Sequence, residues 1–327
     1  MIRIRNARVT AIRAQRPGVT EVMVAVEPDG AEARALGYDG LVGPLEVGDA
    51  VVLNTTAVEL GLGTGGFHLV MARLDVARDD QGPGHVMKAR YTPSQVRVLA
   101  VEEEASPHRA AVASMTSLDG LPVVCAELHS MVPVAAAAIR AVDGDLTVGY
   151  VMSDGAALPL AFSRLAAELR ASGLVAGIVT AGQAFGGDLE AVTLHSGLVA
   201  ALGGRAVACL RLSTADARER HRGVSHHSLT ALGRLALARA WVALPALADA
   251  PLAALVRWQL EEAGVSARHE VVAMDPPDPG KLLAAWGLQV RTMGRGPDDD
   301  PVFFQAAAAA GTLAGRLAAG TEPGVAP

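Results

Sequence analysis

The densest group of side chains able to bind anions or exchange protons lies between Ser213 and Thr230. It follows an apolar run typical of a buried strand and precedes an amphipathic pattern typical of a helix. The candidate residues in it are Arg218, Arg220, His221, Arg222, Ser225, His226 and His227. Arginine binds oxyanions through paired N–H groups, and histidine exchanges protons near neutral pH. Because α/β proteins bind ligands where strands lead into helices, this stretch predicts a site for a small anionic ligand, for example a phosphorylated one.

Three further strand ends in the second half of the chain lead into polar segments, AELHSM, VMSDG and TAGQAFGGD. If the strands are parallel, all four polar segments leave the same edge of one sheet and can line a common crevice. For catalysis we expect His221 or His226 to act as the acid/base group, oriented by Asp154 or Asp188. The candidate ligand-binding residues in the three segments are His129, Ser153, Gly182, Gln183, Gly186 and Gly187.

Several of these segments have alternative interpretations. TAGQAFGGD either cradles an anion or forms a tight turn in which Asp188 caps a helix predicted over residues 188–201. The Arg/His stretch is alternatively a solvated loop. A metal-dependent hydrolase is another alternative, with the donors Glu127, His129, Asp154, His226 and His227. The spacing of these donors matches no recognised metal motif, so the sequence names neither a metal nor a cofactor.

The composition limits the class of protein. The 327 residues carry a formal net charge of −6, and 51% are apolar while only 3% are aromatic. These values predict a core of Ala, Val and Leu and offer no basic face for nucleic acid. The N-terminal segment lacks the apolar run of a signal peptide, and the most apolar helical stretches contain charges, so we expect a soluble cytoplasmic protein without a membrane partner. Cys125 and Cys209 lie in apolar runs, which is typical of small buried thiols.

The pattern of the sequence changes near residue 121. Residues 1–104 contain short alternating or β-branched runs separated by Gly and Pro clusters, which predicts a small β-barrel or sandwich. After a connector over residues 105–120, apolar runs alternate with Ala-rich helical patterns over residues 121–320, and a tail covers 321–327. This alternation predicts an α/β domain with a mainly parallel sheet, so the expected fold class is α+β overall.

The predicted elements divide in the same way. The candidate strands are Ile2–Ile12, Glu21–Val26, Ala50–Val58, Phe67–Leu74, Val86–Arg90, Gln95–Glu102, Leu121–Leu128, Leu146–Met152, Val175–Thr180, Ala206–Leu212, Glu270–Met274 and Gln289–Met293. The candidate helices are Val132–Val142, Leu158–Ala171, Asp188–Ala201, Leu229–Leu244, Pro251–Ala263, Lys281–Trp286 and Val302–Leu317.

A Gly-rich motif lies in the first half of the chain, where Gly61, Gly63 and Gly66 match the spacing of a dinucleotide-binding loop. The residues that follow, FHLVMARLDV, predict a strand instead of the helix that such a loop requires. We therefore interpret the motif as a Gly-rich hairpin or a barrel corner. A non-catalytic ligand sensor or a homo-oligomeric assembly module, with the Gly-rich segments at its interface, is the alternative to an enzyme.

Six segments, in chain order, resemble those of one bacterial family: LNTTAVELGLGTGGFH, GHVMKARYTPSQ, YVMSDGAALPLAFS, AGQAFGGDLEAV, RERHRGVSHHSLT and TMGRGPDDDPVFF. The family is catalogued as domain of unknown function thirty-eight sixty-six, and the resemblance runs from about Ile4 to Ala319. It implies that the six segments form a family signature, but it carries no activity and no catalytic residue. The chain departs from the family between Leu194 and Gly204, where a further Gly-rich segment is lacking.

Overall fold

The computed structural model divides the chain into two compact units. The first comprises Met1–Pro83, Met87–Val98 and Ala161–Ser163, and the second comprises Gly84–Val86, Leu99–Leu160 and Arg164–Pro327. The residues that the structure describes are 2–74, 76–77, 82–114, 122–126, 129–153, 159–193, 196–197, 206–211, 241–244, 269–271, 277–290, 296–299 and 301–320.

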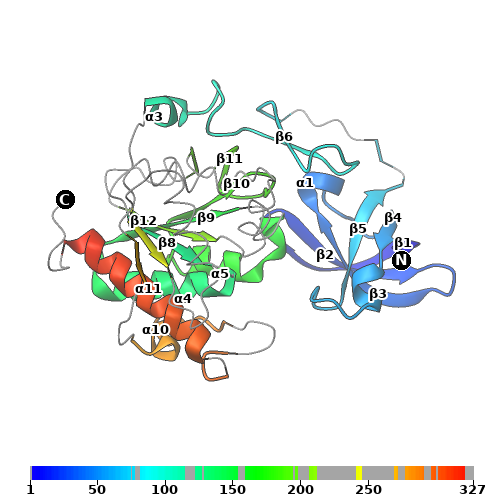
Figure 1. Cartoon of the computed structure of the whole chain (residues 1–327). Coiled ribbons are helices and arrows are strands. Elements are labelled where there is room, and N and C mark those ends of the chain that lie inside the picture. Colours follow the sequence, from blue (N-terminus) through cyan, green and yellow to red (C-terminus); the bar gives the residue numbers. More distant parts are fainter. Residues whose placement is uncertain are drawn as a thin grey trace, which may run out of the picture. The chain divides into compact units, whose positions relative to one another are not determined.

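The first unit contains a closed barrel of five strands (Figure 1). They are β1 Ile4–Arg16, β2 Val19–Val26, β3 Ala31–Tyr38, β4 Ala50–Asn54 and β5 Phe67–Arg73. They follow one another around the barrel in the order β1-β2-β3-β5-β4, with β3 and β5 parallel and the other neighbours antiparallel. A short helix, α1 Asp39–Val42, connects β3 to β4. This topology is that of an OB-fold barrel, which confirms the predicted barrel and excludes the sandwich.

Small apolar side chains fill the barrel. Val9, Val22 and Val24 are almost completely buried, and the pairing of β1 with β2 shifts register twice, which allows the long β1 to curve around the core. β3 was not predicted, because AEARALGY has the composition of a helix. Pairing with β2 and β5 overrides that local preference. The Gly-rich motif leads directly into β5, as predicted for a barrel corner.

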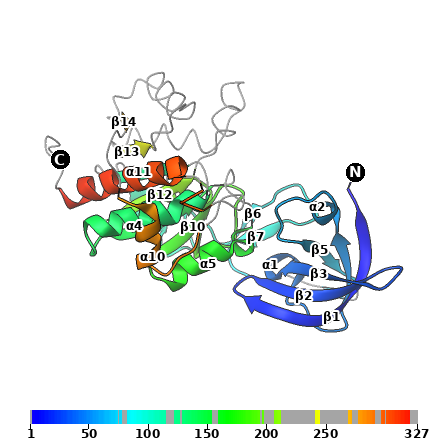
Figure 2. The ribbon, with the colours of Figure 1, turned by 90° about the horizontal axis from the view of Figure 1, so that it is seen from below.

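The second unit is built on a sheet of seven described strands (Figure 2). They are β8 Pro122–Ala126, β9 Thr147–Met152, β10 Gly177–Ala181, β11 Leu189–Ala191, β12 Ala206–Arg211, β13 Trp241–Leu244 and β14 His269–Val271. Their order is β11-β10-β9-β12-β8-β13-β14, and every ladder between them is parallel. The smaller elements among the described residues include α2 Thr56–Glu59, β6 Val86–Lys88, β7 Val96–Val98, α3 Arg109–Ser114, and the 3-10 turns η1 His129–Met131 and η2 Leu160–Phe162.

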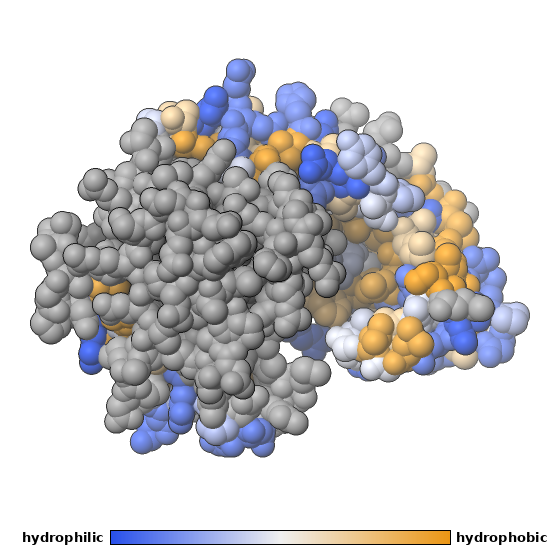
Figure 3. All heavy atoms as spheres, in the orientation of Figure 1, coloured by the Kyte–Doolittle hydropathy of each residue, from blue (hydrophilic) through white to orange (hydrophobic). Residues whose placement is uncertain are grey.

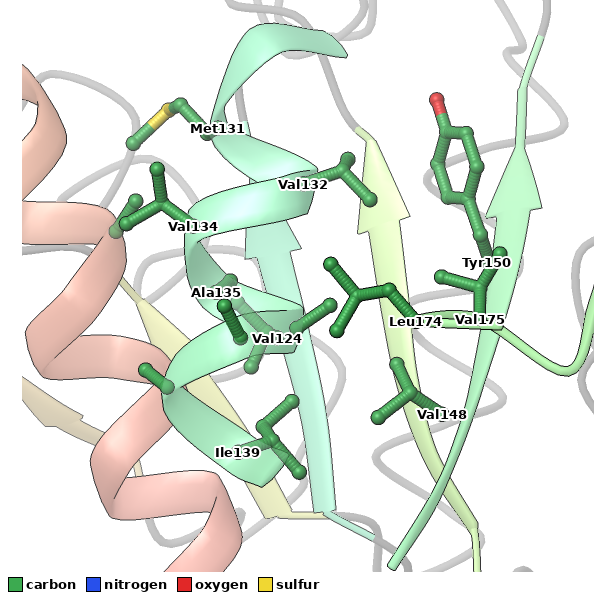
Figure 4. Packing of buried hydrophobic residues seen from close by; sticks show 14 of the residues in the cluster. Val124, Met131, Val132, Val134, Ala135, Ile139, Val148, Tyr150, Leu174 and Val175 are labelled. Carbon is green, nitrogen blue, oxygen red and sulfur yellow. The ribbon is translucent and has the colours of Figure 1, made fainter. Parts of the chain in front are cut away.

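One hydrophobic cluster joins four helices to this sheet. The helices are α4 Val132–Val142, α5 Arg164–Ala171, α10 Pro279–Ala285 and α11 Pro301–Ala319. Figure 4 shows α4 between the strands and α11, with Val132 on the side of the strands and Val134 on the side of α11. The two helices approach closely because small residues line their contact: a Cβ added to Gly311 would lie 2.8 Å from the Cα of Ala135.

The predicted bounds of α4 are confirmed. The observed α11 begins one residue before the predicted helix and ends two residues after it. The helix predicted over 158–171 is instead η2 followed by α5. The helix predicted over 188–201 was wrong for its first turn, because Leu189–Ala191 forms β11 and pairs with β10.

Of the strand predicted over 289–293, the described residues Gln289 and Val290 belong to no strand. Residues 212–240 and 245–268 lie outside the described residues. The chain is therefore a mixed α+β protein with an N-terminal barrel, and the α/β domain over 121–320 stays a prediction.

Candidate functional site

The four polar segments predicted to share a crevice follow four neighbouring strands, in the order β10-β9-β12-β8. The strands are parallel, and Thr180, Met152, Arg211 and Ala126 form one row across their carboxyl ends. The segments after these strands therefore leave one edge of the sheet from adjacent positions. The sequence could not establish this arrangement, because it depends on the strand order.

The chain also reverses its direction across the sheet at this edge. From β8 it passes by way of α4 to β9 and then to β10 on the same side. After β11, at the edge of the sheet, it returns to β12, between β9 and β8, and continues to β13 on the other side of β8. The connections after β8 and β12 thus lead in opposite directions. Such a switch point leaves a crevice outside the carboxyl ends of the two strands, which is where open α/β sheets bind ligands.

A hydrogen-bonded pair, His129 and Tyr150, lies next to this switch point. His129 belongs to η1, which follows β8, and Tyr150 lies in β9. Nδ1 of His129 is 2.9 Å from the Tyr150 hydroxyl oxygen, and the ring centroids are 5.6 Å apart. Tyr150 is fully buried, and Figure 4 shows its ring directed toward the arrowhead of β9. Sequence reasoning found His129 but missed Tyr150, because an apolar strand pattern does not reveal which buried side chain reaches the edge.

Ser153 follows β9 directly and its side chain is buried at the same edge. Together, His129, Tyr150 and Ser153 provide an imidazole, a phenol and a hydroxyl, which are hydrogen-bonding groups without a fixed charge. An anionic ligand at this edge would therefore take its positive partners from another segment. The arginine-rich stretch after β12 is the nearest such segment in the strand order.

The Gly-rich segment between β10 and β11 is a compact turn whose polar groups bond to one another. The amide of Gly186 donates to Glu190 Oε1 at 2.7 Å, and the amide of Gly187 donates to Thr180 Oγ1 at 3.0 Å. The Thr180 hydroxyl in turn donates to Glu190 Oε2 at 2.7 Å. Gly182 and Gly186 have positive φ angles, which favour glycine. Sequence reasoning missed Glu190, since its role depends on the return of the chain beside β10.

Asp188 ties this turn to the scaffold. Its carboxylate accepts from the Ile178 amide at 2.7 Å and pairs with the Arg170 guanidinium at 3.0 Å. The prediction that Asp188 caps a helix was wrong, because β11 begins at the next residue. Its predicted part in orienting a histidine stays a prediction, since His221 and His226 lie outside the described residues.

Two further carboxylates, those of Glu102 and Glu103, belong to the segment that follows Ala100, the residue that pairs with Glu190 of β11. Glu102 accepts from the amides of Val192 at 2.9 Å and Thr193 at 3.1 Å. Glu103 accepts from the amides of Ala100 and His85. Burial alone would raise the pKa of Glu103, but these two amides and the His85 ring outweigh it and hold that pKa below its ordinary value. Glu102 thus holds the residues that follow β11, at the edge of the sheet away from the switch point.

The other candidates lie outside the described residues: Glu127, Asp154, Arg218, Arg220, His221, Arg222, Ser225, His226 and His227. Within the described ranges, no group of three or more His, Cys, Asp or Glu side chains is placed to hold a metal ion. A search of the same residues for a helix with the length and apolar character to cross a bilayer also finds none.

Comparison with known proteins gives a single kind of match. A family described as "Protein of unknown function (DUF3866)" matches residues 34–202 and 199–311. The two matched segments meet at residues 199–202, inside the stretch where the sequence departs from the resembled family. No curated protein and no solved structure matches the chain.

Proposed function

Because the chain belongs to the DUF3866 family, whose function is unknown, we propose a function from the arrangement of its strands. Residues 121–320 form an α/β domain that binds a small anionic ligand, such as a phosphorylated metabolite, outside the carboxyl ends of β8 and β12. Arg218, Arg220 and Arg222 hold the anion, and His221 or His226 exchanges a proton with it.

The strand order carries this proposal. The Arg/His stretch follows β12, whose neighbours β8 and β9 lead into the segments of His129 and Ser153. Arginine and histidine side chains entering a switch-point crevice would complement the uncharged hydrogen-bonding groups already described there. The turn between β10 and β11 contributes less, because the amides of Gly186 and Gly187 donate within it.

A thermal-shift screen of the full-length protein tests the proposal, with inorganic phosphate, pyrophosphate, nucleotides, sugar phosphates and divalent metals as probes. A ligand present at about 100 times its dissociation constant stabilises a protein by about 2.7 kcal/mol, which raises the melting temperature measurably. We expect a phosphorylated probe to do so, and Arg220→Ala and His226→Ala to abolish the effect. Arg13→Ala, an exposed position of β1, is the matched control and should keep it. No shift with any anionic probe would contradict the proposal.

A second candidate is a homo-oligomeric assembly module. In the Gly-rich corner after α2, Leu60 is 63% exposed and Leu62 is 56% exposed. Figure 3 shows apolar patches on the surface of the barrel. Contiguous exposed apolar patches are typical of contact surfaces between proteins. Under this candidate the full-length protein forms a dimer or larger assembly through its barrel.

Light scattering during size-exclusion chromatography distinguishes the two candidates. If the barrel corner is an interface, the double variant Leu60→Asp, Leu62→Asp will have the mass of a monomer and the wild type will have a multiple of it. Met71→Asp, another exposed position of the barrel, is the control for the added charge. A monomeric wild type rejects the assembly candidate and leaves the ligand-binding proposal unaffected.

A further inference from the structure

We infer that the Gly-rich corner of the barrel, residues 60–66, is an acid-sensitive switch that opens when His68 takes up a proton. The corner connects α2 to β5, and His68 is the second residue of β5. It carries the exposed Leu60 and Leu62, so its opening changes the apolar surface that the barrel presents to other molecules. The inference is independent of the anionic ligand proposed above.

The His68 ring is partly buried, and its Nδ1 atom is buried without a hydrogen-bond partner among the described residues. A neutral imidazole tolerates this position, because it can leave Nδ1 without a proton and carry its single proton on Nε2. The protonated ring has a proton on both nitrogens, so Nδ1–H becomes a buried, charged donor without an acceptor. Consistent with this, burial lowers the pKa of His68 below its ordinary 6.5. Protonation therefore drives the ring from its present position unless an acceptor moves to it.

The acid that faces His68 is Glu59 of α2, whose charge favours the protonated ring and opposes the effect of burial. Both of its oxygens are engaged, since Oε1 accepts from the Thr55 hydroxyl at 2.7 Å and Oε2 pairs with the Arg3 guanidinium. The Thr55 hydrogen bond, followed by the charges of Arg3 and Arg5, holds the pKa of this carboxyl below its ordinary 4.5. It therefore stays ionised while His68 titrates, and it can accept from Nδ1–H only by giving up a present partner.

The corner itself is built to open. The Thr64 hydroxyl in its middle is buried and, like Nδ1 of His68, has no hydrogen-bond partner among the described residues. Gly65 and Gly66 have positive φ angles, and the hydrogen bond from Arg34 of β3 to the Gly65 carbonyl, at 2.8 Å, ties them to the neighbouring strand. Arg34 is thus the charged side chain that β3 places at the corner, and β4 has no charged residue. A segment with unsatisfied buried groups and exposed glycines opens at a lower cost than the core strands.

An NMR titration of the full-length protein from about pH 8 to about pH 5 tests the switch. The His68 ring is followed together with the amide of Leu62, which donates to the Ala57 carbonyl at 2.8 Å. We expect the amide to shift with the midpoint of the ring, below about pH 6.5, and its protection from hydrogen exchange to fall about tenfold or more. His68→Leu should remove this transition, and His85→Gln, which replaces an exposed histidine, should keep it.

Two charge variants distinguish the switch from a general loss of packing, and they keep the test decisive if His68→Leu unfolds the barrel. Glu59→Gln removes the charge that favours the protonated ring and should lower the shared midpoint by roughly 0.5 of a pH unit. Arg3→Met removes a positive charge and frees Oε2 of Glu59 to accept from His68, so it should raise the midpoint. An amide that stays unshifted while the ring titrates, a transition that persists in His68→Leu, or a midpoint that neither charge variant moves would overturn the inference.

Discussion

Asp188 illustrates, at the scale of one residue, how a side chain with catalytic chemistry is bound into a scaffold. Its carboxylate joins the Ile178 amide to the Arg170 guanidinium. We predict that Asp188→Asn lowers the free energy of unfolding by roughly 1–2 kcal/mol, because a charged acceptor is lost from a partly buried amide while the exposed part of the ion pair contributes little. Urea unfolding measures this difference.

Two further sets of variants serve as controls for this prediction. Asp145→Asn, at an exposed turn, should change the free energy of unfolding by less than about 0.5 kcal/mol. In a double-mutant cycle, Arg170→Met should cost less in the Asp188→Asn background than in the wild type, because the two side chains interact directly. Equal costs in the two backgrounds would show that the ion pair does not stabilise the turn.

The contact between α4 and α11 carries a prediction at the scale of the element. Alanine at position 311 would gain up to about 1 kcal/mol in helix propensity over glycine. Its Cβ, however, would lie 2.8 Å from the Cα and 2.9 Å from the carbonyl carbon of Ala135, and backbone atoms cannot yield without moving a helix. The clash outweighs the propensity, so we predict that Gly311→Ala destabilises the protein by roughly 1–3 kcal/mol.

Thermal or urea unfolding monitored by tryptophan fluorescence measures this effect, since Trp286 packs against the same cluster. Gly144→Ala is the matched control: no atom lies within 4 Å of its added Cβ, so the unfolding midpoint should be unchanged or slightly higher. A midpoint for Gly311→Ala at or above that of Gly144→Ala would mean that the two helices separate at low cost.

The elements also show which features a sequence reveals. α4 was predicted with its observed bounds, because an unbroken apolar helical pattern is local information. β3 was missed and β11 was mistaken for a helix, because both are specified by the strands beside them. His129 was found from its place after an apolar run, whereas Tyr150 and Glu190 acquire their roles from residues distant in the sequence.

At the scale of the whole barrel, two titratable groups, the buried Tyr38 and the partly buried His68, make stability depend on pH. Burial raises the pKa of Tyr38 to about 12, against the opposing charge of Arg16. The unfolded chain loses this proton first, near its ordinary value of 10.0, so stability falls as the pH rises above about 10. Burial lowers the pKa of His68 below its ordinary 6.5, against the charge of Glu59. The unfolded chain gains this proton first, so stability also falls below about pH 6.5.

We therefore predict that Tyr38→Phe removes part of the alkaline loss and His68→Leu part of the acid loss, each without affecting the other limb. Urea unfolding followed by NMR of the barrel methyl groups, on either side of about pH 6.5 and about pH 10, measures both limbs. Each variant is the control for the other. If one variant flattened both limbs, a general change in packing would explain the result better than the titration of one group.

The place of β12 in the sheet has a consequence for how the protein is made. β8 and β9 leave the ribosome well before β12, which lies between them in the finished sheet. Until residue 211 has been synthesised, β8 and β9 each keep an edge whose backbone groups pair with β12 in the finished sheet. If β8 and β9 pair with each other first, they must separate again before β12 can enter between them. Such unpaired edges attract other chains. A nascent chain halted between residues 152 and 206 would therefore be the species most dependent on a chaperone.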